Sequence, residues 1–363
     1  MKEATLSSRR NFCKGHFCVE LCPSQKSYPI RSSGAKKTAA AIVAVFSVFL
    51  LLFVLLQNPV TLPPVTFPVS LPDSTETNAT EPEGNNQNGA VPDSSSKPDG
   101  YDELVDYALT LINNDRQANG EENVTLSNIN SAQIHADNLL EHSFLSHWDL
   151  NGYTPYMRYT LAGGEGAVSE NCAWMYSSRV LDPKEALEDL QWNMMNDDAD
   201  FDWGHRHNIL DSFHNRVSIG VSYNDTAVCL VQDFEGAYVS WDTLTFSDSE
   251  VTMKGTMTEQ NLSIHQVAIH YDNSVPLTVE QLMNPPFNRG YSVGTFVGMV
   301  LPSGWESTEG ITVTAQVWTQ DDPNFEIRFD LSEAFDSHGD GVYTLLLWTE
   351  DNYLTTFSVW HQV

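Results

Sequence analysis

The stretch Trp203–Leu210 (WGHRHNIL) places two histidines, an arginine and a glycine directly before an apolar segment. Upstream, Ser146–Asp149 (SHWD) and Ser169–Asn171 (SEN) have a similar polar character. Histidines and a carboxylate from three separate segments can converge on one pocket that holds a metal ion or a polar ligand. The candidate site residues are therefore His147, Glu170 and His205, with Asn171 and Arg206 beside them.

Helical periodicity surrounds these segments and gives way to strand patterns. Leu104–Ile112 and Ala132–Leu140 carry apolar residues at helical spacing. Another helix is expected after Asp182, because DPKE supplies an N-cap acid, a proline at the first helical position and a following glutamate. RVSIGVSY (216–223) and AVCLVQDF (227–234) predict a hairpin. This order favours a layered α+β fold.

Together these segments resemble the CAP superfamily, also called SCP-like, which includes cysteine-rich secretory proteins, antigen-5 proteins, plant pathogenesis-related proteins and many prokaryotic relatives. The matching segments are LINNDRQANG (111–120), HADNLLEHSFLSHWDLNGYTPYMRY (135–159), SEN (169–171) and GHRHNIL (204–210). Their order and separation agree with that family. The resemblance implies an α-β-α sandwich with a central cavity over residues 101–241.

Eukaryotic members of that family line the cavity with two histidines and two glutamates, which can hold a divalent cation. By matched position, the resemblance assigns these roles to His147, His205 and Glu170. Met195 or Asn196 stands where the second glutamate is expected, as in the prokaryotic branch. Two imidazoles and one carboxylate suit zinc with water completing the shell. The alternative is a buried hydrogen-bond network that stabilises the cavity wall.

Other chemical motifs are weak. Asp198–Asp202 (DADFD) suggests calcium, but an EF-hand loop would need glycine and glutamate where Trp203 and Ile209 stand, so an irregular calcium site or a solvated acidic loop is expected. The sequence contains no H-E-x-x-H and no glycine-rich phosphate loop. His135 lies in the apolar stripe of its helix, which favours a core histidine over a ligand.

The N-terminal region has a different composition. Residues 1–37 contain eight of the 18 basic residues, and the following run Ala39–Leu56 carries no charge. As a helix this run would span roughly 27 Å, close to the thickness of a bilayer core. We therefore expect a cytoplasmic tail at 1–37, a transmembrane signal-anchor at 38–57 and an extracellular remainder on the cell membrane. Residues 58–100 are rich in Pro, Ser and Asn and predict a disordered linker.

The five cysteines divide between these compartments. Cys172 and Cys229 fall in predicted strands of the outer domain, as a disulfide or as two buried thiols. Cys13, Cys18 and Cys22 lie in the tail, where CKGHFCVELC resembles a fragment of a zinc site without a second half.

The chain is strongly acidic, with a formal net charge of −30 and 48 acidic against 18 basic residues. Such a surface disfavours nucleic acid and anionic lipid headgroups as partners. It suits solubility in an exposed environment, and binding of divalent cations is the alternative interpretation.

Residues 242–363 change to a period of two. Phe325–Leu331 and Ile311–Val317 alternate apolar and polar side chains, with Gly, Asp and Asn between such runs. This pattern predicts an all-β sandwich, immunoglobulin-like in a loose sense. Modules of this kind commonly serve as spacers or adhesive surfaces, which is an analogy at the level of fold.

The sequence therefore favours a membrane-anchored extracellular protein that binds a lipid, glycan or protein ligand, because no complete catalytic set is present. The alternative is a metal-dependent hydrolase acting on peptide or cell-envelope substrates. In that case His147 and His205 would hold zinc, and Glu170 would act as ligand or general base. A third hypothesis is a structural role at the cell surface.

Overall fold

The structure is a computed structural model that describes residues 12–14, 17–22, 100–259 and 262–362. The expected anchor at 38–57 and nearly all of the linker at 58–100 lie outside these residues, as does most of the tail at 1–37. Within the described part, no helix is long and apolar enough to cross a membrane.

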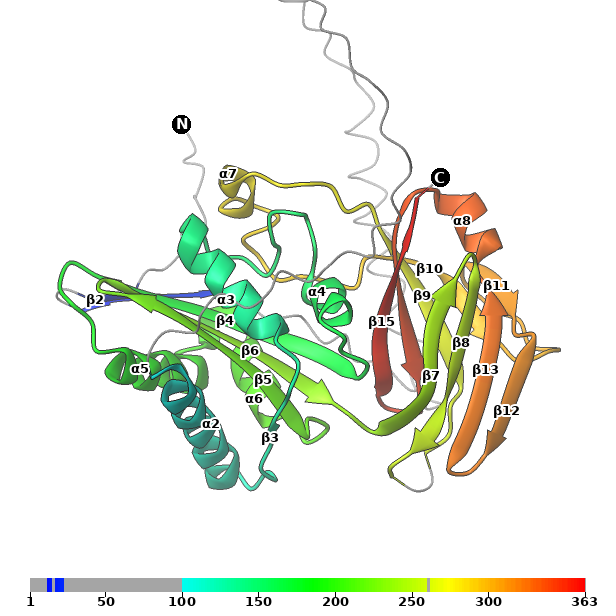
Figure 1. The fold of residues 1–363 in the computed structure, drawn as a ribbon, viewed down its shortest axis with the longest axis horizontal. Helices are drawn as coiled ribbons and strands as arrows, with labels where there is room; N and C mark the ends of the chain where they lie inside the picture. The colour runs from blue at the N-terminus through cyan, green and yellow to red at the C-terminus, as the bar shows by residue number, and fades with distance from the viewer. Residues whose placement is uncertain (1–11, 15–16, 23–99, 260–261, 363) are drawn as a thin grey trace, which may run out of the picture. The chain divides into compact units, whose positions relative to one another are not determined.

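The first domain contains most of the helices (Figure 1). Its helices are α2 (Tyr101–Ala118), α3 (Ser131–His142), α4 (Pro155–Leu161), α5 (Pro183–Asn196), the 3₁₀ turn η1 (Ala199–Phe201) and α6 (Gly204–Leu210). Its strands are β3 (Thr125–Leu126), β4 (Ala167–Ser177), β5 (Arg216–Asn224) and β6 (Ala227–Gly236). The expected start of α5 is confirmed, because the Asp182 side chain accepts hydrogen bonds from two backbone N–H groups of the first turn.

Helices cover both faces of the central sheet, whose strand order is β1-β2-β4-β6-β5-β3. On one face, Ala136 and Leu139 of α3 share a core with Cys172 of β4. On the other face, Ile112 of α2 and Leu187 of α5 share a core with Ala173, the next residue along β4. Consecutive strand residues point to opposite faces, so the domain has the α-β-α layering that the resemblance implies.

Two short strands near the N-terminus extend this sheet. β1 (Phe12–Lys14) pairs with β2 (Phe17–Cys22), and β2 pairs antiparallel with β4. This pairing places residues 17–22 beside β4, which differs from the cytoplasmic tail expected for residues 1–37.

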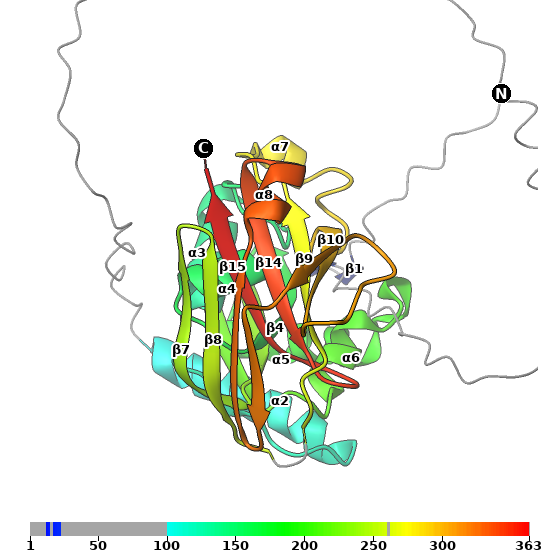
Figure 2. The ribbon, with the colours of Figure 1, turned by 90° about the vertical axis from the view of Figure 1, so that its right-hand side faces the viewer.

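The second domain consists of two sheets that enclose one core (Figure 2). One sheet has the order β11-β10-β9-β14-β15 and the other β12-β13-β8-β7. The elements are β7 (Val239–Ser247), β8 (Glu250–Met257), β9 (Gln266–Asp272), α7 (Val279–Leu282), β10 (Thr295–Leu301), β11 (Ile311–Thr314), β12 (Val317–Asp321), β13 (Asn324–Asp330), α8 (Ser332–His338), β14 (Gly341–Trp348) and β15 (Tyr353–His361). The layers match the expected β-sandwich, although the expected domain boundary at 241 falls inside β7.

The connection between β9 and β10, residues 273–294, crosses onto the first domain, and we call it the strap. Its Leu277 N–H donates to the Leu150 carbonyl over 2.8 Å. Leu277 and Leu282 belong to the same core cluster as α3. Gly152 has φ of 76°, and a Cβ there would lie 2.2 Å from the Val275 carbonyl oxygen. Glycine is therefore required where the strap meets the first domain.

Candidate functional site

Glu170 of β4 is the centre of a buried cluster on the α3 face of the sheet. Its Oε1 lies 2.8 Å from His147 Nδ1 and accepts a hydrogen bond from the Cys172 thiol over 3.2 Å. Its Oε2 pairs with the Arg158 guanidinium. Burial opposes ionisation of Glu170, but Arg158 and the neighbouring histidines outweigh burial and hold the pKa of this carboxyl well below its usual range.

His135 of α3 borders the same cluster and is fully buried. Its Nε2 lies 2.8 Å from the Ser146 carbonyl oxygen, and its Nδ1 has no hydrogen-bond partner within the described residues. Burial, followed by the charge of Arg158, lowers the pKa of His135 to about 3. His135 is therefore neutral at physiological pH and is the core histidine that its apolar stripe predicts.

Asp233 and Tyr291 complete the cluster. Asp233 of β6 lies opposite Glu170 in the sheet and accepts a hydrogen bond from the Ser131 hydroxyl over 2.5 Å. Burial first, and then the Glu170 charge, raise the pKa of Asp233 well above its usual range. Tyr291 belongs to the strap, and its hydroxyl accepts the Glu170 backbone N–H over 2.7 Å. Its ring lies 4.6 Å from the His147 ring, so Tyr291 covers the cluster from the second domain.

His205 lies in a different environment, on the opposite face of the sheet. Its Nδ1 is 2.6 Å from Asp198 Oδ1, and its backbone N–H donates to Asp198 Oδ2 over 2.9 Å. Its carbonyl accepts the Asn171 side-chain amide over 3.1 Å. Glu170 and Asn171 are consecutive in β4 and point to opposite faces. The described contacts bring His147 and Glu170 together, and they place His205 against Asp198 and Asn171.

Asn171 and Arg206 also lie on the α6 side. Asn171 accepts the Asn208 side-chain amide over 3.0 Å, within a chain of buried amides. Arg206 donates to the Met195 carbonyl over 2.9 Å, with its guanidinium 5.9 Å from the Trp203 ring centre. Both residues connect α6 to its neighbours, and the Asn208 amide also donates to the Glu170 backbone carbonyl over 3.3 Å.

These contacts do not fit a zinc site built from His147, Glu170 and His205, because His205 is bonded to Asp198 on the other face. In the described ranges, the candidate ligand atoms that lie within 4.8 Å of one another belong to His135, Glu170 and Cys172. A cation there would face the Arg158 guanidinium, and His135 Nε2 is already committed to a backbone carbonyl. The calcium interpretation is also weakened, since Asp198 accepts from His205.

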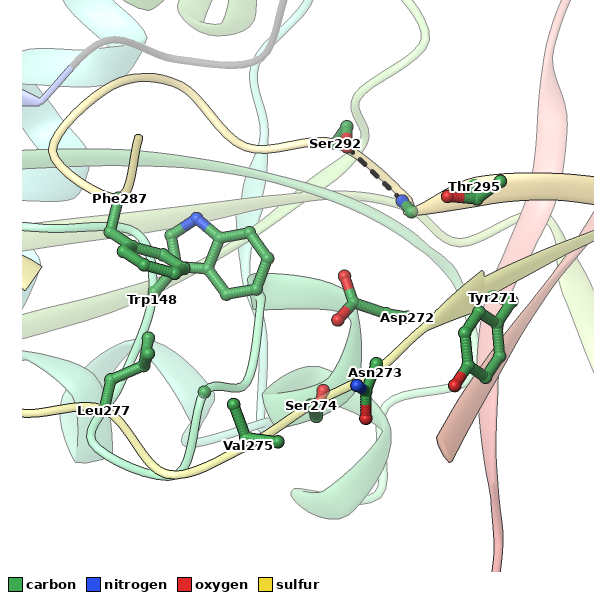
Figure 3. Close-up of a pocket in the computed structure, with 12 residues that line it drawn as sticks. Trp148, Tyr271, Asp272, Asn273, Ser274, Val275, Leu277, Phe287, Ser292 and Thr295 are labelled. Carbon is green, nitrogen blue, oxygen red and sulfur yellow. Dashed lines mark hydrogen bonds between the residues drawn. The ribbon is translucent and has the colours of Figure 1, made fainter. Parts of the chain in front are cut away.

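A cavity of about 480 Å³ opens beside the cluster, between the first domain and the strap (Figure 3). Aromatic and aliphatic side chains form part of its lining, and Figure 3 shows the Asp272 carboxylate pointing toward the Trp148 ring. Trp148 directly follows His147, and its ring meets Phe287 edge-on with centroids 5.3 Å apart. Burial raises the pKa of Asp272 above its usual value.

Residues 109–234 match the family described as the cysteine-rich secretory protein family, CAP. Residues 109–234 are a CAP domain. The chain is similar to an extracellular protein containing an SCP domain from Bacillus anthracis str. Ames, with 17% identity and a TM-score of 0.30 over 37% of this chain and 40% of that one. It is also similar to the CAP domain of enterococcal PrgA, with 17% identity and a TM-score of 0.27 over 37% and 60% of the two chains. The chain thus spans less than two thirds of either structure, and no curated protein matches it.

The buried carboxyl of Asp233 in the CAP domain should make stability depend on pH. Its folded-state pKa is raised, so its contribution to stability is complete at low pH and is lost as the pH rises above about 4. We expect Asp233→Asn to be stabilised relative to the parent at pH 8 and to show little of this difference at pH 4. Asparagine can still accept the Ser131 hydrogen bond. Urea unfolding at both pH values measures this effect.

The matched control is Asp106→Asn, at an exposed position on α2. The difference in free energy of unfolding between this control and the parent should be the same at both pH values. A stability difference for Asp233→Asn that does not change with pH would show that Asp233 titrates normally.

Proposed function

We propose that the protein is an extracellular binding protein in which the CAP domain and the strap hold a ligand together. The observation that supports this proposal is that both carboxylate oxygens of Glu170 already have partners. One carboxylate oxygen faces His147 and the other Arg158, and Tyr291 lies over them. His147 and Glu170 are both fully buried.

This arrangement is poorly suited to hydrolysis. A general base must come within hydrogen-bond distance of the proton that it removes. Glu170 is fully buried in an ion pair that holds its pKa low, which makes it a weak base. The cluster instead satisfies its own charges, as a network that supports the cavity wall would.

A binding and hydrolysis assay tests this function. Full-length protein in lipid nanodiscs is incubated with peptidoglycan sacculi, phosphatidylcholine vesicles and denatured casein, with and without zinc. We expect co-sedimentation or co-flotation with one of them and no release of soluble products. Zinc-dependent product release that is lost in Glu170→Gln, but kept in the exposed control Glu141→Gln, would support the hydrolase and overturn the proposal.

Membrane attachment through residues 38–57 is a separate proposal that rests on the uncharged run there. A single crossing would place the N-terminus inside the cell, away from β4. We therefore expect an epitope fused to Met1 to be shielded from antibody on intact cells and accessible after permeabilisation. Accessibility on intact cells would contradict a single-pass anchor and would agree with the pairing of β2 and β4.

A further inference from the structure

We propose that the cavity between Trp148 and the strap binds a saccharide, as one or more pyranose units of a glycan. This inference rests on the proposed binding function and names its ligand class. Its volume of about 480 Å³ lies within the usual range of small-molecule sites. The lining residues are Trp148, Gly152, Tyr271, Asp272, Asn273, Ser274, Val275, Leu277, Phe287, Ser292, Gly294 and Thr295.

The apolar part of the lining suits the C–H face of a sugar ring. Trp148 is half-buried, and Phe287 packs edge-on against it and holds its ring in place. An aromatic ring fixed in this way offers a flat surface at low conformational cost. The Tyr271 hydroxyl donates to the Asp340 carbonyl over 2.8 Å, so Tyr271 contributes its ring rather than its hydroxyl.

The polar part of the lining suits hydroxyl groups. Asp272 supplies carboxylate oxygens that only accept, while Asn273 and Thr295 can both donate and accept. Sugar hydroxyls also donate and accept, so such a mixed set can satisfy them. Figure 3 shows Asp272 and Thr295 on the side of the cavity away from Phe287.

An alkyl chain fits this lining less well. Covering Asp272 with a hydrocarbon tail would bury a carboxylate without a new partner, which carries a large desolvation cost. A small cationic amine is the nearer competitor, because one carboxylate beside aromatic rings attracts it. An amine would leave Asn273, Ser292 and Thr295 largely unused, and a saccharide would use them.

The cavity walls are held by backbone contacts. Gly152 meets the Val275 carbonyl, and Gly294, with φ of 94°, lies where a Cβ would be 2.4 Å from the Tyr271 carbonyl oxygen. Both approaches need glycine. The walls are therefore formed before the ligand arrives, which lowers the cost of binding.

Saturation-transfer NMR and calorimetry test the inference on full-length protein in nanodiscs, with empty nanodiscs as background. The probes are the trisaccharides of N-acetylglucosamine and of glucose, and choline represents the amine class. We expect at least one trisaccharide to bind and choline not to bind. Asp272→Asn and Trp148→Ala should each lower the affinity for the trisaccharide by about tenfold or more. This is the effect expected for the loss of a charged hydrogen bond or of an aromatic contact.

The matched controls are Asp242→Asn and Trp305→Ala, at exposed positions outside the cavity. They should leave the trisaccharide affinity within twofold of the parent. If Trp148→Ala does not fold, the isosteric Thr295→Val, at an exposed cavity position, replaces it.

Three results would overturn the saccharide inference: binding of neither trisaccharide, trisaccharide binding that both cavity variants leave unchanged, and choline binding that Asp272→Asn abolishes. The proposed function fails separately. Binding of vesicles or casein that is lost in Asp272→Asn would keep the binding function and reject the saccharide. Zinc-dependent hydrolysis without any binding would reject both.

Discussion

Replacing Arg158 with methionine should lower the free energy of unfolding by about 3–5 kcal/mol, the usual cost of removing one partner from a buried ion pair. Arg158 is the cation that compensates Glu170, and its side chain is only 6% exposed. It also donates to the His147 and Tyr153 carbonyls over 2.6 Å and 2.9 Å. Urea unfolding at pH 7 measures the loss.

The pH dependence of this loss has a defined sign. Glu170 has a lowered folded-state pKa in the parent, so its contribution to stability is present at neutral pH and is lost as the pH falls. Without Arg158 that contribution disappears, and the difference between variant and parent should shrink toward acid. The double variant R158M/E170Q should recover part of the loss, because no unpaired charge remains.

Arg179→Met is the matched control, because Arg179 is exposed. It should change the free energy of unfolding by no more than about 0.5 kcal/mol. Equal unfolding midpoints for the two arginine variants would mean that Arg158 does not compensate a buried charge.

Replacing Tyr291 with alanine should cost about 3–5 kcal/mol, as for other large aromatic residues removed from a core. Tyr291 is 4% exposed and packs against the rings of His147 and Tyr156. Tyr291→Phe keeps the ring but leaves the buried Glu170 N–H without its acceptor, so it should cost about 1–3 kcal/mol. Unfolding of both variants under the same conditions separates the ring from the hydroxyl.

Trp305→Ala removes an aromatic residue that is 69% exposed and should change stability by no more than about 0.5 kcal/mol. A loss in Tyr291→Ala as small as in this control would show that the strap does not cover the CAP domain in solution.

The layers of the CAP domain could be predicted from the sequence because they depend on local patterns. The cap at Asp182, the helical stripes and the 216–234 hairpin each depend on neighbours in the chain. The pairing of His147 with Glu170 followed from the family resemblance. It was harder to predict which face of the sheet each site residue occupies. Glu170 and Asn171 differ by only one position, and the alternation of side chains along a strand places them on opposite faces.

The partners that complete the cluster gave weaker signals. Arg158 stands in the short segment YMRY, where an isolated cation among large apolar side chains could have indicated a buried ion pair. Asp233 is a single acid in the apolar run AVCLVQDF, a comparable signal. Tyr291 comes from the other domain, more than one hundred residues from Glu170. Such a contact depends on how two domains pack, which periodicity does not encode.

The family match ends at Phe234, but the apolar core does not end there. Leu277 and Leu282 of the strap pack in the same cluster as Ala136 and Leu139 of α3. In a fragment that stops after β7, that apolar face of α3 would be exposed to water. We expect such a fragment to self-associate. The CAP domain of this protein therefore cannot be isolated at the end of its family match, because residues of the strap complete its core.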